Sequence, residues 1–162
     1  MDASRPGMDD LIALISSLPG VDPLTADATS GAPEIAWGDS FFYYDPDRDQ
    51  PADRRMPFAT IVTKDYPGFD TESRLDRPGV FRLNISVGRD AFARLLGYPP
   101  AAHAEQPGID YAVLDRLLPH PVYAVQSWVS VLNPGPDTAE LVRSLLTEAH
   151  ARAMRRHRTT TV

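Results

Sequence analysis

The residues best suited to form a binding surface lie in residues 80–87, where polar and apolar side chains alternate. Such alternation is typical of a half-buried strand, because successive side chains of a strand point to opposite faces. Arg82, Asn84 and Ser86 therefore share one face, and the apolar residues at 81, 83, 85 and 87 share the other. A guanidinium beside an amide offers a ligand several hydrogen-bond donors.

A second strand region, residues 122–132, carries a matching polar set. Its valines at 125, 129 and 131 fit the core side, which leaves Gln126 and Trp128 on the opposite face. If both strands join one sheet, these two residues lie on the same side as Arg82 and Asn84. An aromatic platform beside arginine and amide groups binds flat ligands, nucleobases or peptides. The alternatives are that a loop or a second subunit covers this face, or that Trp128 belongs to the core.

A charged stretch, residues 64–79, separates two of the expected strands. We interpret it first as an ion-paired loop, with a clamp for an anionic ligand as the sharper alternative. In that alternative Lys64 and Arg74 lie at the rim of the polar sheet face. An enzyme would instead use Lys64, Asp65 or His120 as acid–base groups, which requires the three side chains to converge in one pocket.

No metal or cofactor is predicted. The acidic run beginning at Asp45 resembles the start of a calcium loop, but Gln50 and Met56 stand where glycine and glutamate are required. The four histidines show no ligand spacing, and the chain has no cysteine, so thiolate metal sites and thiol catalysis are excluded.

Charge is unevenly distributed along the 162 residues, whose net charge is −6. Residues 1–53 hold eleven acidic residues against two arginines, and the remainder holds eleven against fourteen basic residues. This balance disfavours a nucleic-acid binder, although Arg-rich loops and the basic C-terminal tail leave that function open as an alternative. The absence of cysteine and of a basic leader favours the cytoplasm, and no apolar run is long enough to span a membrane. Fifteen arginines against a single lysine, Lys64, indicate a GC-rich genome.

Periodicity predicts one α+β domain over residues 8–157, with flexible ends at 1–7 and 158–162. We expect an antiparallel sheet with helices packed on one face. The expected helices are residues 8–18, 89–96 and 109–118 and a closing helix after 137; the expected strands are a hairpin at 34–44 and strands at 58–63, 80–87 and 122–132.

These features, in this order, resemble the MmcQ/YjbR-like superfamily, and within it an actinobacterial branch that is a domain of unknown function. The matching residues are Leu18-Pro19-Gly20-Val21, Trp37-Gly38-Asp39 with Phe41-Phe42, Phe58-Ala59-Thr60-Ile61, Phe92 with Leu95-Leu96-Gly97, His120-Pro121-Val122-Tyr123, Trp128, and Leu145, Leu146 and Ala149. The resemblance implies a two-layer α+β fold like that of secretion chaperones, and it supplies no catalytic residue.

The sequence therefore predicts a cytoplasmic, non-enzymatic binding domain whose ligand is a small molecule or a protein partner. Arg82, Asn84, Gln126 and Trp128 would form the site, with Lys64 and Arg74 at its rim. We expect alanine at position 82 or 128 to weaken binding while the fold survives. A homodimer that buries the same face is an alternative use of it.

Overall fold

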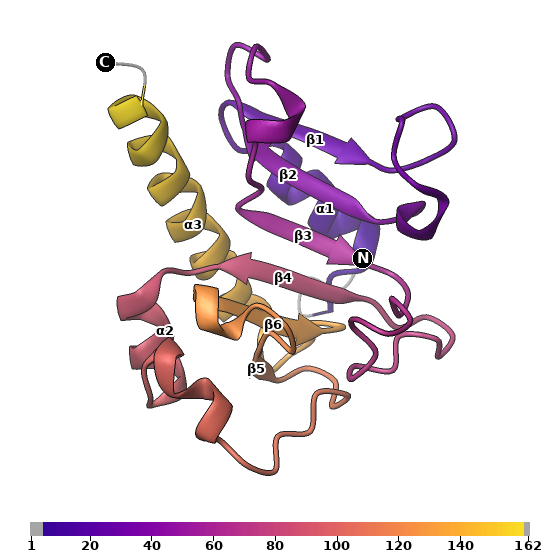
Figure 1. The fold of residues 1–162 in the computed structure, drawn as a ribbon, viewed down its shortest axis with the longest axis vertical. Helices are drawn as coiled ribbons and strands as arrows, with labels where there is room; N and C mark the ends of the chain where they lie inside the picture. Colours follow the sequence, from indigo (N-terminus) through magenta and orange to yellow (C-terminus); the bar gives the residue numbers. More distant parts are fainter. Residues whose placement is uncertain (1–4, 161–162) are drawn as a thin grey trace.

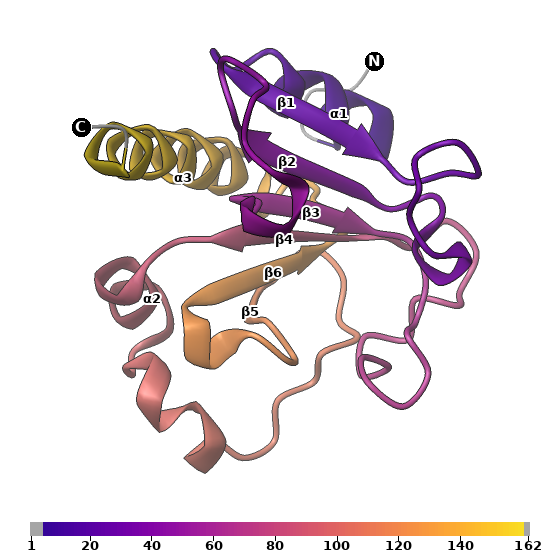
Figure 2. The ribbon, with the colours of Figure 1, turned by 45° about the horizontal axis from the view of Figure 1, so that its top comes forward.

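The computed structural model describes residues 5–160, which form an open six-stranded sheet and three α-helices (Figures 1 and 2). The helices are α1 (Met8–Ser16), α2 (Arg89–Leu96) and α3 (Ala139–Thr160). The strands are β1 (Val21–Thr25), β2 (Ser40–Tyr44), β3 (Ala59–Val62), β4 (Arg82–Ser86), β5 (Leu117–Pro119) and β6 (Trp128–Leu132). Short 3-10 helices occupy Glu34–Ala36, Ala52–Arg54, Pro100–Glu105 and Ala124–Gln126.

The strands run in the order β1-β2-β3-β4-β6-β5, and every neighbouring pair is antiparallel. The predicted α+β class with an antiparallel sheet is therefore confirmed. In the register of the central strands, Asn84 lies between Thr60 of β3 and Ser130 of β6. Ser86 lies opposite Trp128, so the two alternating strands of the sequence are direct neighbours.

One face of the sheet carries the main hydrophobic core, to which all three α-helices contribute. Leu83 and Ile85 of β4 are buried there against residues such as Leu146 of α3 and Phe92 of α2. Burial of an aliphatic or aromatic side chain contributes roughly 2 kcal/mol. The apolar side of β4 is therefore part of the core, and its polar side, with Arg82 and Asn84, faces the opposite side of the sheet.

The opposite face is crossed by the chain between β3 and β4 and by the segment leading to β5. A smaller apolar cluster forms where they meet the sheet, around Val62, Leu75, Leu118 and Leu132. The charged stretch of residues 64–79 is thus a cover over one end of the sheet, because Leu75 anchors it in this cluster.

Two sequence predictions about elements are wrong. The hairpin at residues 34–44 does not form: β2 pairs with β1 instead, a strand that sequence analysis missed because it contains a proline. Pro23 is tolerated there because β1 is an edge strand. The helix at residues 109–118 is absent too, since Asp115 has a positive φ of 55° and accepts hydrogen bonds from the start of α3, including 3.1 Å from the N–H of Thr138.

The expected strand at residues 122–132 is shorter than predicted, because residues 124–126 form a 3-10 helix before β6 begins. Residues 1–4 and 161–162, where we expect flexible ends, lie outside the described residues, and α3 continues to Thr160. None of the helices in residues 5–160 combines the length and apolar character needed to cross a membrane.

Candidate ligand-binding cavity

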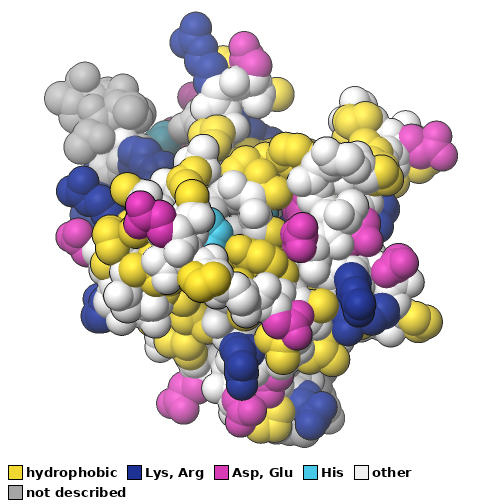
Figure 3. Space-filling view, turned by 60° about the horizontal axis from the view of Figure 1, so that its bottom comes forward, with side chains coloured by type: hydrophobic (Ala, Val, Ile, Leu, Met, Phe, Trp, Pro, Cys, Tyr) yellow, Lys and Arg dark blue, Asp and Glu magenta, His cyan; other side chains and the backbone are white. Residues whose placement is uncertain are grey.

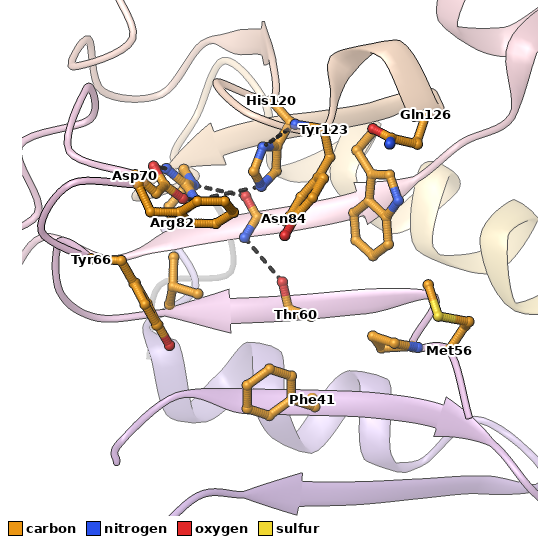
Figure 4. Close-up of a pocket in the computed structure, with 14 residues that line it drawn as sticks. Phe41, Met56, Thr60, Tyr66, Asp70, Arg82, Asn84, His120, Tyr123 and Gln126 are labelled. Atoms are coloured by element: carbon orange, nitrogen blue, oxygen red, sulfur yellow. Dashed lines mark hydrogen bonds and ion pairs between the residues drawn. The ribbon is translucent and has the colours of Figure 1, made fainter. Parts of the chain in front are cut away.

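A cavity of about 420 Å³ opens on the sheet face opposite the main core. Its floor is formed by side chains of β3 and β4, and its walls come from the segments 56–57, 66–70 and 120–128 (Figure 4). The lining residues are Phe41, Met56, Pro57, Thr60, Val62, Tyr66, Phe69, Asp70, Arg82, Asn84, His120, Tyr123, Gln126 and Trp128. This volume lies within the usual range for small-molecule sites, roughly 300–1,000 Å³.

A row of three polar side chains crosses the floor from strand to strand. The Asn84 Nδ2 donates to Thr60 Oγ1 at 3.0 Å, and the Ser130 hydroxyl donates to Asn84 Oδ1 at 2.7 Å. The three residues are partners in the strand register, so the sheet itself positions them. These bonds hold the Asn84 amide in one orientation, with its oxygen toward Arg82 and Ser130.

Arg82 is 1% exposed and forms a bidentate ion pair with Asp70. Its Nη1 donates to Asp70 Oδ1 at 3.0 Å, and its Nη2 donates to Oδ2 at 2.6 Å. Nη1 also donates to the Ser73 hydroxyl at 2.9 Å, and Nε donates to Asn84 Oδ1 at 2.8 Å. A charge this deep is tolerated only when it is paired and hydrogen-bonded, so the chain between β3 and β4 supplies its counter-ion.

His120 lies beside Arg82 and is almost completely buried. Its Nδ1 accepts the backbone N–H groups of Val122 and Tyr123, both at 2.9 Å, which turns the chain sharply before β6. Burial, and next the nearby charge of Arg82, lower the pKa of His120 to about 3. The ring is therefore neutral at pH 7, and because Nδ1 is the acceptor, the proton is on Nε2.

Aromatic and apolar side chains surround this polar floor. Tyr123 lies over His120, with ring centroids 4.9 Å apart, and Phe69 packs against Tyr123 at 6.1 Å. Met56, Phe69 and Tyr123 are all exposed, although they are large and apolar. In the space-filling view, hydrophobic side chains gather in the middle of the molecule's visible face, with charged side chains of both signs around them (Figure 3).

The structure brings four of the six predicted site residues together. Arg82, Asn84, Gln126 and Trp128 all line the cavity, and Arg82 and Trp128 lie on the same side of the sheet. Gln126 reaches it from the 3-10 helix before β6 rather than from a strand. The other two predicted residues, Lys64 and Arg74, are not among the residues that line it.

Lys64 belongs to a separate network centred on Asp39, which is fully buried. Asp39 Oδ1 accepts the backbone N–H of Thr63 at 2.8 Å and lies 3.3 Å from the Lys64 ammonium, while the Tyr66 hydroxyl donates to Oδ2. Burial, and next the hydrogen bond to Asp39, raise the pKa of Tyr66 well above its usual value. This network fixes the end of β3, and through Tyr66 it fixes one wall of the cavity.

The proposed acid–base set does not converge. His120 lines the cavity, but Lys64 points to Asp39, and Asp65 accepts the backbone N–H of Leu75 at 2.8 Å. In the basic tail, Arg152 is half-buried and donates to the Ser86 carbonyl at 3.2 Å. Arg152 therefore helps to hold α3 against the end of β4.

Sequence reasoning missed Asp70, Phe69 and Tyr123. Asp70 is one of several acidic residues in a loop, and no local pattern indicates that it pairs with Arg82, twelve residues away. The sequence did carry a signal for such a partner, because an arginine within an alternating strand pattern must be paired if it is buried. Tyr123 and Phe69 come from different loops and meet only in the folded chain.

The fold and the cavity define a class of protein: an α+β domain with a cavity on the sheet face opposite the α-helices. The chain belongs to a family of unknown function, DUF6194, whose model matches residues 3–162. Its structure is similar to the crystal structure of the Deinococcus radiodurans protein DR2400, a DUF419 domain protein, with 15% identity and a TM-score of 0.50 over 92% of this chain and 78% of that one. At this identity the similarity shows the fold alone. No curated protein matches the chain in sequence.

Proposed function

We propose that this protein is a binding domain for a small, mainly apolar molecule, which occupies the cavity over Asn84. The observation that carries the proposal is the coincidence of an apolar cavity of about 420 Å³ with a few fixed polar groups at its floor. Cavities of this kind are the usual form of small-molecule sites, in which apolar walls give affinity and a few polar groups give orientation.

The exposed apolar side chains at the mouth support the same function. Met56 is 73% exposed and Phe69 is 59% exposed, although both could bury their apolar area against an occupant. A group of exposed apolar residues around a cavity usually indicates a binding surface, whereas isolated exposed apolar residues do not. We do not expect the cavity to act as an anion clamp, because Asp70 already neutralises Arg82 and no further charged side chain among residues 5–160 lines it.

Saturation-transfer NMR with a library of planar aromatic fragments tests the proposal directly. We expect several fragments to bind, and Trp128 fluorescence to change with them in a Trp37→Phe variant, which leaves Trp128 as the only tryptophan. Trp37 is a suitable residue to remove because it lies outside the cavity and is partly exposed. Failure of every fragment to bind would end the proposal.

A matched pair of variants locates the binding. Gln126 lines the cavity and its neighbour Val125 does not, although both are exposed residues of the same 3-10 helix. Gln126→Trp should fill the mouth and reduce fragment binding by about ten-fold or more, the equivalent of roughly 1.4 kcal/mol. Val125→Trp should leave binding unchanged. Equal effects of the two variants would place the fragments elsewhere on the molecule.

We further propose that the chain is of the MmcQ/YjbR-like type and acts in the cytoplasm. The ordered residue matches of the sequence support the first statement, together with the α+β architecture. An experimental structure superposed on MmcQ/YjbR-like proteins would test it, with the strand order β1-β2-β3-β4-β6-β5 as the feature to compare. Cell fractionation tests the location.

A further inference from the structure

We infer that the cavity takes a neutral ligand with a hydrogen-bond acceptor oxygen, such as an aromatic ketone, ester or amide, and that this oxygen sits between His120 and Arg82. The inference rests on the proposed function of the cavity and assigns its ligand class. It comes from the donors that remain at the cavity floor after the protein's own hydrogen bonds are formed.

Four of the five N–H bonds of Arg82 are directed at oxygen acceptors of the protein. They go to Asp70 Oδ1, Asp70 Oδ2, the Ser73 hydroxyl and Asn84 Oδ1. The fifth, on Nη2, faces the Nε2 atom of His120 at 3.5 Å. A guanidinium carries only donors, so this last N–H needs an acceptor.

His120 cannot be that acceptor. Its Nδ1 is occupied by the N–H groups of Val122 and Tyr123, so Nδ1 carries the lone pair and Nε2 carries the proton. Nε2 of His120 and Nη2 of Arg82 are then two donors side by side in a buried place. Both side chains are more than nine-tenths buried, and both line the cavity (Figure 4).

A ligand oxygen beside this pair can take up both donors. The nitrogen atoms lie 3.5 Å apart, so an oxygen about 2.9 Å from each stands to one side of the line that joins them, and the Arg82 N–H must tilt away from Nε2 to reach it. Buried donors without an acceptor are costly, so a ligand that supplies the oxygen gains the hydrogen bonds and relieves that cost. A pure hydrocarbon of the same shape would leave both donors without an acceptor.

The ligand class follows from the charge of the site. The charges of Arg82 and Asp70 cancel and His120 is neutral, so the floor of the cavity carries no net charge. A carboxylate would lose its hydration without gaining a free counter-ion, whereas a carbonyl loses far less. The aromatic walls favour a flat body on the ligand. Tyr123 lies over His120 and is 41% exposed, so its ring is part of the wall beside the pair.

Three probes of nearly equal shape test the inference: 2-acetylnaphthalene, 2-isopropenylnaphthalene and 2-naphthoate. They present a carbonyl, a hydrocarbon and a carboxylate to the same place. We expect the wild-type protein to bind the ketone about ten-fold more tightly than the hydrocarbon, and more tightly than naphthoate. The ketone should also shift the Nε2–H resonance of His120 in NMR spectra.

The variant His120→Asn separates the binding role of this residue from its structural one. An asparagine oxygen can accept the same two backbone N–H groups, because Asn stabilises such turns, but it supplies no donor at the Nε2 position. The variant should keep the wild-type fold and hydrocarbon affinity and lose the ten-fold preference for the ketone. Thermal unfolding and the backbone NMR spectrum check the fold.

The outcomes are distinct. If the ketone and the hydrocarbon bind the wild type equally, or if naphthoate binds most tightly, the ligand class is wrong while the cavity remains a binding site. If the preference for the ketone survives in His120→Asn, the oxygen lies elsewhere. If none of the three probes binds, the proposed function falls, and this inference falls with it.

Discussion

The guanidinium of Arg82 and the carboxylate of Asp70 face each other through two parallel hydrogen bonds of 3.0 and 2.6 Å. Arg82 is the first residue of the central strand β4, and Asp70 lies in the chain between β3 and β4 that crosses the sheet face. The pair therefore fastens this cover over the sheet, and it removes the positive charge of Arg82 from the cavity. A residue that the sequence suggests as a ligand anchor is first of all a structural one.

Replacing Arg82 should consequently damage the fold. Arg82→Met leaves the buried Asp70 without a counter-ion and should lower the free energy of unfolding by about 3–5 kcal/mol. The double variant Arg82→Met, Asp70→Leu should recover much of that loss, since it removes both charges. Urea unfolding of the single and double variants measures the coupling between the two residues.

The surface pair Arg94–Glu148 is the control, because its closest atoms are 3.9 Å apart and both side chains are mostly exposed. Arg94→Met should cost less than about 1 kcal/mol. A loss at Arg82 as small as this would contradict the buried pair. The sequence predicts that the fold survives alanine at position 82; the buried ion pair with Asp70 leads us to expect a loss of stability instead.

Stability should fall on acidification because of His120. Its pKa is about 3 in the folded protein and near 6.5 in the unfolded chain, so only the unfolded chain binds a proton between these values. The contribution is fully present above pH 6.5 and is lost as the pH falls toward 3, by at most roughly 1.4 kcal/mol per pH unit.

Urea unfolding at several pH values, with wild type and His120→Asn compared, isolates this effect. Burial also lowers the pKa of His103, so the wild-type slope alone combines the two histidines. The stability difference between the two proteins should shrink as the pH falls from 6.5 toward 4.5. A difference independent of pH would mean that His120 titrates normally in the folded protein.

The hydrogen bonds accepted by Asp39 should stabilise the chain at the end of β3. Asp39→Ala leaves Thr63, Lys64 and Tyr66 without their shared acceptor and should cost roughly 2–3 kcal/mol in unfolding free energy. Because Tyr66 lines the cavity, fragment affinity should fall as well. Asp76→Ala, at an exposed position of the same face-crossing chain, should change neither quantity measurably.

Gly20 should tolerate no side chain. A Cβ atom there would lie 2.5 Å from the Tyr44 ring, and the residue has a φ of 74°. Gly20→Ala should therefore cost more than Gly31→Ala, whose φ of 83° imposes the same backbone strain but whose surroundings are empty. We expect about 1–2 kcal/mol for Gly31→Ala and roughly 1–3 kcal/mol more for Gly20→Ala. Equal thermal stabilities would show that Tyr44 can move aside.

Local patterns were sufficient where a residue's environment depends on its neighbours in sequence. The alternation in residues 80–87 indicates which side chains of β4 face the core, and the periodicity of residues 8–18 indicates α1. The same reasoning failed at β1, because Pro23 is acceptable only in an edge strand, and edge position depends on the whole sheet. It failed again at residues 109–118, where no helix forms and the Asp115 carboxylate accepts a hydrogen bond from Thr138, just before α3.

By itself, the sequence determined the α+β class and the shared face of Arg82 and Asn84, because strand periodicity is local; the pairing of β4 with β6 added Trp128 to that face. Only the tertiary structure decided which partners the side chains on and around that face have. It joined Asp70 to Arg82, turned His120 so that Nδ1 meets the backbone, and left Lys64 with Asp39 outside the cavity. The two ion pairs join residues 12 and 25 positions apart, and pairing at such separations is set by packing and by the need to neutralise buried charge.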